Sequence, residues 1–246
     1  MTVIDELLAS LPPGEIPIRD ARVGAFWTVV WTGQGAGLAS TQRDAHTPHG
    51  QSLIRWAGDL TAHTAGELAG LLSSESPMEA ALGMAAVNAL LAPDLQALPD
   101  RNAIDEIERR GQGTRVAIVG HFPFVARLRD SVGHLDVLEL DPGPDELPAG
   151  AAARVLPQAG VVVITGTALV NKTFASLVAH CQPDAFVLVI GPSAPLSPVL
   201  FDYGVDLIAG TVVEDPRTAL TVAGQGAIHR QLHGTRMATM SREGNG

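Results

Sequence analysis

The sequence has only one cysteine, Cys181, and only one lysine, Lys172. A single cysteine excludes an internal disulfide framework and is typical of a reducing compartment, so we expect a cytoplasmic protein. No stretch reaches the roughly 18 consecutive apolar residues of a membrane-spanning helix. Residues 1–20 carry early acidic residues and lack the basic start of a signal peptide.

Basic residues are also scarce, at 16 against 26 acidic residues, and the formal net charge is −10. This charge argues against nucleic acid or an anionic membrane as a partner, because both repel an acidic protein. It is consistent with the handling of cations, although acidity often serves solubility alone. With 246 residues and 46% hydrophobic residues, the chain can fill the core of one large domain or two smaller ones.

From residue 115 onwards, short apolar runs alternate with segments of helical character. Such runs are typical of strands buried on both faces of a parallel sheet, with helices between them. Ligands of these sheets bind in the loops that follow the strands. The expected strands are residues 115–119, 135–140, 161–165, 186–190 and 207–213, and the expected helices are 124–132, 172–180, 199–203 and 217–224.

The first hundred residues have a different pattern. They predict a helix within residues 1–10, a strand over 20–32, a turn at 33–35, a second strand over 36–41 and a helix over 65–72. Ser76 and Glu79 form the pattern of a capping box, and the helix that follows is apolar almost all round and hence buried. Asn88 is its polar exception. We therefore expect an α+β domain (1–96), a linker (97–113), a doubly wound α/β domain (114–224) and a tail (225–246).

Three polar residues follow the first two strands of the α/β part. His121 ends one strand, and Glu139 and Asp141 end its expected neighbour, so these side chains could converge on a divalent metal ion. In the alternative interpretation His121 only caps the next helix and both acids face solvent. The G-x-G-x-x-G motif of a standard NAD site is absent, but Glu139 and Asp141 lie where a ribose-binding acid sits, which keeps a nucleotide-type ligand open.

Two further loops follow expected strands. Lys172 lies in the first, and unlike arginine it can lose its proton when it is desolvated, which makes it a candidate catalytic residue; chance placement is the alternative. In the second, Gly191, Pro192 and Ser193 begin a proline-rich loop. Its remaining N–H groups and hydroxyls could receive an anion, or the loop could simply be rigid.

The remaining histidines and the cysteine carry weaker signals. His46 and His49 form one pair and His229 and His233 another, without the Cys or Glu partners of a zinc site, so surface positions are favoured. Cys181 has no partner histidine apart from its chain neighbour, which favours a core position over a nucleophile.

The chain resembles a bacterial and archaeal family of putative heavy-metal chelation domains. The resemblance rests on the motifs GAFWTVVWTGQGAGLA, ALGMAAVNA, VAIVGHFPF, LELDP, TGTALVNKT and GPSAPLSPVLFDYGVDLIAG. It implies an enolase-N-terminal-like α+β domain followed by a Rossmann-like α/β domain with a doubly wound parallel sheet. It also implies an active site in the cleft between them, approached by Thr28 and Asn88.

Two functions remain open at this point, and a nucleotide-type cofactor is a weaker third. In the first, the cleft holds a divalent metal ion or metal chelate through His121, Glu139 and Asp141. In the second, an enzyme acts on a small anionic metabolite, such as a metallophore precursor, with Lys172 and His121 as catalytic acid/base groups. The apolar composition suggests a homodimer. The expected substrate-binding residues are Thr28, Asn88, Phe122, Thr165, Gly166, Asn171, Thr173, Gly191, Pro192 and Ser193.

Overall fold

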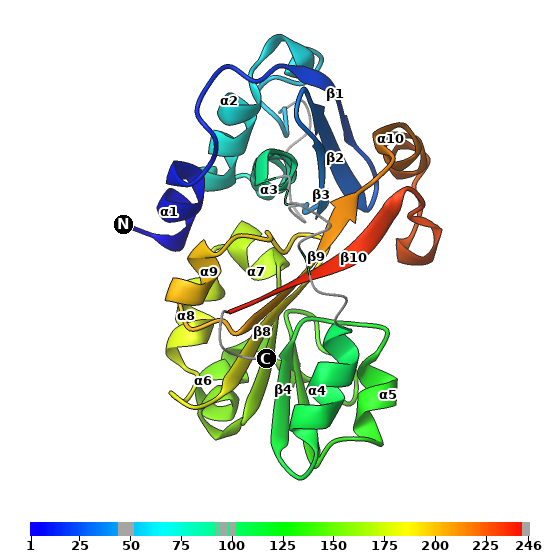
Figure 1. The fold of residues 1–246 in the computed structure, drawn as a ribbon. Coiled ribbons are helices and arrows are strands. Elements are labelled where there is room, and N and C mark those ends of the chain that lie inside the picture. Colours follow the sequence, from blue (N-terminus) through cyan, green and yellow to red (C-terminus); the bar gives the residue numbers. More distant parts are fainter. Residues whose placement is uncertain (44–51, 92, 94–97, 99–101, 243–246) are drawn as a thin grey trace.

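The computed structural model describes residues 1–43, 52–91, 93, 98 and 102–242. The expected loop at 42–50, with His46 and His49, therefore lies almost entirely outside the described residues. The fold has a small antiparallel sheet in the N-terminal part and a larger sheet below it, with helices around both (Figure 1). The predicted α/β class is confirmed.

The small sheet has the order β1 (Ile18–Val23), β2 (Trp27–Thr32), β3 (Ala36–Ser40), with antiparallel pairing throughout. The prediction of one strand over residues 20–32 is wrong, because the chain turns at Gly24. The amide of Gly24 donates to the carbonyl of Trp27 at 2.9 Å. A Cβ at Gly24 would lie 2.1 Å from the carbonyl oxygen of Ala223, so only glycine allows this close approach.

Helices cover both faces of the small sheet. The buried helix α3 (Pro77–Leu91) packs against β2 and β3 on one face, and α10 (Pro216–Gly224) lies against the other (Figure 1). The remaining N-terminal helices are α1 (Val3–Ala9), η1 (Leu60–Ala62), α2 (Ala65–Gly70) and η2 (Leu71–Ser73). Helix α10 lies in the C-terminal half of the sequence, so one face of the small sheet is covered by a helix from that half.

The large sheet has the strand order β10-β9-β8-β7-β4-β5-β6. All neighbours pair in parallel except β10, which is antiparallel to β9. This is a doubly wound order that reverses direction between β4 and β7, the point at which such sheets bind ligands. The strands are β4 (Arg115–Val119), β5 (His134–Glu139), β6 (Leu147–Pro148), β7 (Val161–Thr165), β8 (Phe186–Gly191), β9 (Leu207–Val213) and β10 (Thr235–Ser241).

Both faces of the large sheet are buried, as the β-branched runs predict. Alternate strand residues face two separate groups of helices. One face packs against α4 (Ala103–Gly111) and α5 (Val125–Arg129). The other face packs against α6 (Ala152–Val155), α7 (Thr167–Val170), α8 (Phe174–Ala179) and α9 (Val199–Asp202). The C-terminal part also has three short 3₁₀ turns, η3 (Ala149–Ala151), η4 (Leu156–Gln158) and η5 (His229–Gln231).

Two segments differ from their predictions. Helix α4 lies within the expected linker, where the Asn102 side chain caps it and Ile107 is fully buried against the sheet. Strand β10 lies within the expected frayed tail, where each of its residues pairs with one of β9. Within the described part of the chain, no helix is long and apolar enough to cross a membrane.

Candidate functional site

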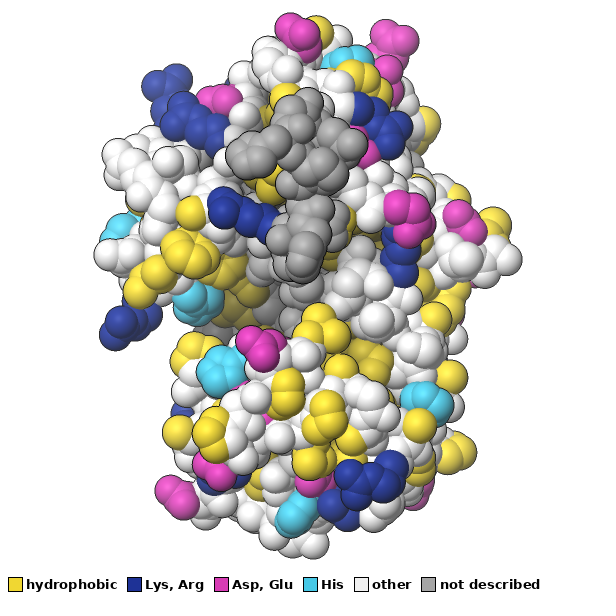
Figure 2. All heavy atoms as spheres, turned by 180° about the vertical axis from the view of Figure 1, so that it is seen from behind, with side chains coloured by type: hydrophobic (Ala, Val, Ile, Leu, Met, Phe, Trp, Pro, Cys, Tyr) yellow, Lys and Arg dark blue, Asp and Glu magenta, His cyan; other side chains and the backbone are white. Residues whose placement is uncertain are grey.

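A cavity of about 830 Å³ lies at the carboxyl ends of β4, β5, β7 and β8. Its walls include Trp27, Ser40 and Gln42 from the N-terminal part, so both parts of the molecule contribute. The back view shows the molecule hollowed between these parts, with hydrophobic and histidine side chains at the edge (Figure 2). A cavity of this volume accommodates a small organic molecule rather than a lone ion.

Phe122 covers the ends of the strands β4 and β8. Gly120 after β4 and Gly191 at the end of β8 have φ values of 115° and 117°, and a Cβ at either would lie within 3.8 Å of the Phe122 ring. The ring stacks on Phe124 at a centroid distance of 5.0 Å. In nucleotide-binding sheets the backbone at this point approaches a pyrophosphate. A dinucleotide bound in that way would require Phe122 to move.

His121 lies at the rim of the same cavity and is held by a carboxylate. Its Nδ1 is 2.8 Å from Oε1 of Glu146, while Oε2 of Glu146 accepts from the amide of Gly143 at 2.9 Å. Both hydrogen bonds hold the pKa of Glu146 below its usual value, and the one from the Gly143 amide has the larger effect. Glu146 is therefore ionised at neutral pH and fixes the orientation of the imidazole.

Hydroxyl groups join the two parts of the molecule at the cavity wall. The Ser193 hydroxyl is buried and accepts from the amide of Ser40 at 2.9 Å, so the loop after β8 is fixed to strand β3. Thr165 and Thr167 also line the wall, with their hydroxyls 3.2 Å apart. The structure thus gives Ser193 a role in joining the parts as well as a place in the cavity wall.

Most of the residues predicted from the sequence lie around this cavity. Most of them lie at the end of a strand or in the loop after it, and Asn171 and Thr173 lie between α7 and α8. They are His121, Phe122, Glu139, Thr165, Asn171, Thr173, Gly191, Pro192 and Ser193.

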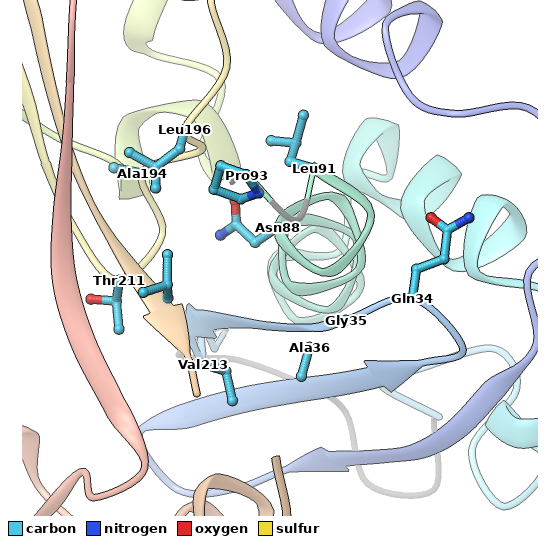
Figure 3. Close-up of a pocket in the computed structure, with 11 residues that line it drawn as sticks. Gln34, Gly35, Ala36, Asn88, Leu91, Pro93, Ala194, Leu196, Thr211 and Val213 are labelled. Carbon is cyan, nitrogen blue, oxygen red and sulfur yellow. The ribbon is translucent and has the colours of Figure 1, made fainter. Parts of the chain in front are cut away.

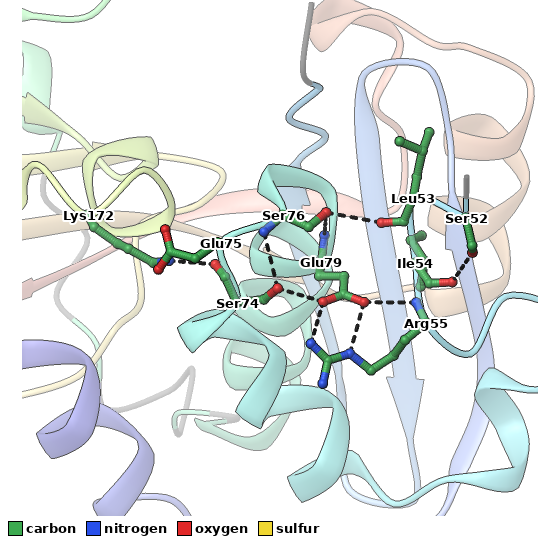
Figure 4. Close-up of polar contacts among 9 residues, drawn as sticks. All are labelled: Ser52, Leu53, Ile54, Arg55, Ser74, Glu75, Ser76, Glu79 and Lys172. Carbon is green, nitrogen blue, oxygen red and sulfur yellow. Dashed lines mark hydrogen bonds and ion pairs between the residues drawn. The ribbon is translucent and has the colours of Figure 1, made fainter. Parts of the chain in front are cut away.

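Lys172 lines a different, smaller pocket of about 300 Å³. Its Nζ donates to Oε1 of Glu75 at 2.8 Å and to the carbonyl of Ser74 (Figure 4). The structure therefore does not bring Lys172 and His121 into one cavity. In this position Lys172 joins the C-terminal part to the segment before α3.

Thr28 and Asn88 also lie away from the main cavity. The Thr28 hydroxyl is buried and lies 2.9 Å from the hydroxyl of Thr41. Asn88 donates from Nδ2 to the carbonyl of Leu38 at 2.8 Å, which ties α3 to β3. It lines a third pocket of about 270 Å³ between α3, β3 and β9, whose other labelled residues include Ala36 and Thr211 (Figure 3).

Two further predicted residues do not line the main cavity. Gly166 packs against the loop after β8, where a Cβ would lie 2.3 Å from the amide nitrogen of Ala194, and its own amide donates to the carbonyl of Ile190. Asp141 is exposed and is not part of the cavity wall.

Among the described residues, the cavity wall does not assemble a site for a resident metal ion. Such an ion needs three or four protein donors, and the described residues contain no group of three His, Cys, Asp or Glu side chains that could hold one. Glu139 lines the cavity with His121, but its Oε2 accepts from the amide of Leu140 at 2.9 Å. The predicted set of His121, Glu139 and Asp141 is thus not assembled as a ligand group.

Several residues at the cavity were not predicted from the sequence. Trp27, His229 and Arg230 line its wall, and Glu146 contacts the wall residue His121. Glu146 lies in a turn-rich loop and carries no motif, whereas Trp27 has a visible signal as a large aromatic residue on a strand. The indole N–H of Trp27 is buried and has no hydrogen-bond partner among the described residues. His229 and Arg230 come from η5 in the expected tail, and the His229 ring lies 6.1 Å from that of Trp27. His233 is exposed outside the cavity.

The charge of the cavity wall differs from that of the whole protein. Among the described wall residues the fully charged side chains are Glu139 and Arg230, accompanied by three imidazoles, His121, His180 and His229. In a chain of formal charge −10, a wall without net negative charge repels an anion less than the charge of the whole chain implies.

Comparisons with known proteins give matches along most of the chain. A family model described as "Putative heavy-metal chelation" matches residues 102–241, and a second model with the same description matches residues 4–91. An uncharacterised protein of Methanocaldococcus jannaschii is 26% identical over 161 residues, which are 63% of this chain and 62% of that protein. The match therefore spans less than two thirds of that relative.

Two solved structures share the fold. A protein with unknown function from Desulfitobacterium hafniense DCB-2 has a TM-score of 0.85 and 23% identity, with 98% of each chain covered. A protein with unknown function from Pyrococcus horikoshii has a TM-score of 0.77 and 18% identity, again over 98% of each chain. At these identities the likeness concerns the fold alone.

Proposed function

Because the chain belongs to the family described as putative heavy-metal chelation, we propose that its main cavity binds a metal chelate, a metal ion already held by a small organic ligand. The family membership confirms the resemblance seen in the sequence motifs. The metal is then cargo, and the organic ligand supplies most of its donors.

One observation carries this proposal: a cavity of about 830 Å³ that contains no group of three metal-binding side chains among the described residues. A bare ion would fill a small fraction of this volume and would find too few donors. An organic chelate provides both the missing volume and the missing donors. The apolar wall around Phe122 and Trp27 would cover the organic part.

The charge of the wall supports the same choice. Small organic chelators such as citrate, nitrilotriacetate and dipicolinate are carboxylates, so their complexes with divalent metals carry negative or no net charge. Arg230 and the imidazoles of His121, His180 and His229 face such a ligand with only Glu139 as an acidic residue in the described wall. An anionic chelate is therefore better suited to this wall than a bare cation.

Binding measurements test the proposal directly. We expect the protein to bind nickel or copper complexes of citrate, nitrilotriacetate or dipicolinate at least ~10-fold more tightly than the metal chlorides, by equilibrium dialysis with metal analysis. Ala153→Trp adds bulk to the cavity wall on α6 and should abolish this preference. Ala175→Trp, at an exposed position of α8 that lines another pocket, is the matched control. Equal or tighter binding of the chlorides would refute the proposal.

A second candidate function is an enzyme acting on a small anionic metabolite in the same cavity. It is favoured by the pair of His121 and Glu146, because a carboxylate-oriented imidazole at a cavity rim is suited to general acid/base catalysis. Incubation of a metabolite extract with the wild type and with His121→Gln, followed by mass spectrometry, tests it. A compound consumed by the wild type and spared by the variant supports catalysis, and identical extracts argue against it.

A further inference from the structure

We infer that the Nε2 atom of His121 is the protein's own donor to the metal of the bound chelate, and that Glu146 is the residue that positions it. The ligand class is therefore narrower than any metal chelate: it is a chelate that leaves a coordination position open. This inference rests on the proposed function, and it adds which metal chelates the cavity selects.

The hydrogen bond to Glu146 decides which nitrogen of His121 is available. A neutral imidazole carries one proton, and an ionised carboxylate can only accept a hydrogen bond, so the proton lies on Nδ1. The lone pair then lies on Nε2, for which the described residues provide no hydrogen-bond partner. A carboxylate behind a histidine is also the arrangement that orients metal-binding imidazoles in proteins.

Glu146 is itself held in place. Its side chain is 11% exposed, against 72% for His121, and its second oxygen accepts from the amide of Gly143. The amide of Glu146 in turn donates to the carbonyl of Gly143 at 3.1 Å, which closes the turn. The carboxylate is therefore a fixed support, whereas the imidazole in front of it is open to the cavity.

The position in the fold separates this pair from the other histidine–carboxylate pairs. His134 lies 3.2 Å from Asp136 and His63 lies 3.7 Å from Glu67. His134 begins β5, at the edge of the sheet opposite the cavity, and it contacts Asp136 through Nε2. Neither His134 nor His63 lines the cavity, so His121 is the one of these three histidines that a bound chelate would reach.

A single protein donor to the metal, Nε2 of His121, limits which chelates can bind. A chelator that fills every position around the metal leaves none for Nε2, whereas one with fewer donors leaves a position that an imidazole can take from water. Nickel, copper, cobalt and zinc accept imidazole readily, and magnesium and calcium do not. The expected ligand is thus an unsaturated chelate of a borderline metal.

The test compares two copper chelates on the same protein. Copper–nitrilotriacetate has an open position and copper–EDTA does not. We expect the wild type to bind the nitrilotriacetate complex at least ~10-fold more tightly than His121→Ala does, with imidazole nitrogen splitting in the electron paramagnetic resonance spectrum that the variant lacks. His134→Ala is the matched control and should behave as the wild type. The EDTA complex should not distinguish the wild type from His121→Ala.

Glu146 is tested by two substitutions. Glu146→Ala should weaken binding of the open chelate by roughly 10-fold and shift the nitrogen resonances of His121 toward mixed tautomers. Glu146→Gln should weaken binding less than Glu146→Ala, because its amide oxygen can still accept from Nδ1 of His121, although its NH2 group cannot accept from the Gly143 amide. Circular dichroism checks that each variant is folded.

The outcomes separate this inference from the proposed function. If both chelates bind equally well to the wild type and to His121→Ala, the inference fails and the cavity still binds chelates. If neither chelate binds the wild type more tightly than copper chloride, the proposed function itself fails. Unchanged nitrogen resonances in Glu146→Ala would remove Glu146 from the inference.

Discussion

Lys172 and Glu75 form an ion pair between the two parts of the molecule, with 2.8 Å between Nζ and Oε1 (Figure 4). The Lys172 ammonium also donates to the carbonyl of Ser74. Glu75 is 95% exposed, so water and salt screen the ion pair strongly. The backbone of Lys172 has a φ of 63°, the left-handed region that is uncommon for residues other than glycine.

Loss of the Lys172 side chain should affect stability slightly and chelate binding not at all. We expect Lys172→Gln to lower the free energy of unfolding by about 1 kcal/mol or less, since exposed ion pairs contribute little. Chelate affinity should remain that of the wild type, because Lys172 lines a separate pocket. Urea unfolding and equilibrium dialysis measure the two quantities. A loss of chelate binding without unfolding would place Lys172 in the functional site.

The left-handed backbone at Lys172 can be tested with two variants that both lack the long side chain. We expect Lys172→Gly to be more stable than Lys172→Ala by about 1 kcal/mol, because glycine adopts a positive φ without a steric penalty. Urea unfolding of both variants provides the comparison. Equal stabilities would mean that the unfolded-state entropy of glycine cancels the relief of strain.

The buried carboxylate of Glu79 should make the protein sensitive to acid. It accepts from Nε and Nη2 of Arg55 at 2.9 and 2.7 Å and from the hydroxyl of Ser74 at 2.6 Å (Figure 4). The Arg55 hydrogen bonds, as the largest cause, lower the pKa of Glu79 from 4.5 to about 2. A lowered folded-state pKa gives stability that is present above pH 4.5 and is lost as the pH falls toward 2, roughly 3 kcal/mol in total.

Glu79→Gln should therefore lower the free energy of unfolding by about 2–4 kcal/mol at pH 7 and reduce its fall between pH 5 and pH 2.5. The matched control is Glu67→Gln, which removes an exposed carboxylate from the capping box of α2 and should cost less. Urea unfolding across this pH range measures both. Parallel pH profiles for the wild type and Glu79→Gln would contradict the assignment.

Two glycines at the strand ends should tolerate a methyl group differently. Both Gly120 and Gly191 have positive φ, so alanine is strained at each by about 1–2 kcal/mol. At Gly120 the new Cβ would also lie 2.9 Å from Cβ of Thr165, whereas at Gly191 its nearest contact is Phe122 at 3.8 Å. We expect Gly120→Ala to be the less stable variant by thermal unfolding. The reverse order would show that the loop after β4 relaxes more easily.

Cys181 should react slowly with thiol reagents. Burial raises the pKa of its thiol from 9.0 to about 11, so the reactive thiolate is about 100-fold scarcer at pH 8 than in an exposed thiol. Alkylation by iodoacetamide should be correspondingly slow in the native protein and fast in urea. Rapid alkylation of the native protein would instead indicate an accessible nucleophile.

Much of the large sheet could be predicted from the sequence because its strands are buried on both faces. Residues 115–119, 161–165 and 207–213 were predicted with the bounds that β4, β7 and β9 have in the structure. Local patterns were less reliable where a side chain contacts a residue that is distant in the sequence. Ser76 accepts from the amide of Glu79 as in a capping box, but the Glu79 carboxylate turns to Arg55 instead of back to Ser76.

The sequence could indicate those residues of the candidate site that lie at the ends of the predicted strands. His121, Thr165 and Gly191 line one cavity in the structure, because parallel strands end at one edge of a sheet. Glu146 and His229 could not be found in this way. Glu146 reaches His121 across a proline-rich loop. His229 lies in a 3₁₀ turn between α10 and β10, and its place at the wall depends on the packing of both elements.

The sequence alone determined the central parallel strands of the large sheet, the buried helix α3 and the edge of the sheet at which polar residues gather, because hydrophobic periodicity and turn residues act over a few positions. Only the tertiary structure decided that Lys172 pairs with Glu75, that Glu146 orients His121, and that α10 packs on one face of the small sheet. These contacts join residues far apart in the chain. Their formation depends on how the helices and sheets pack, which no local pattern records.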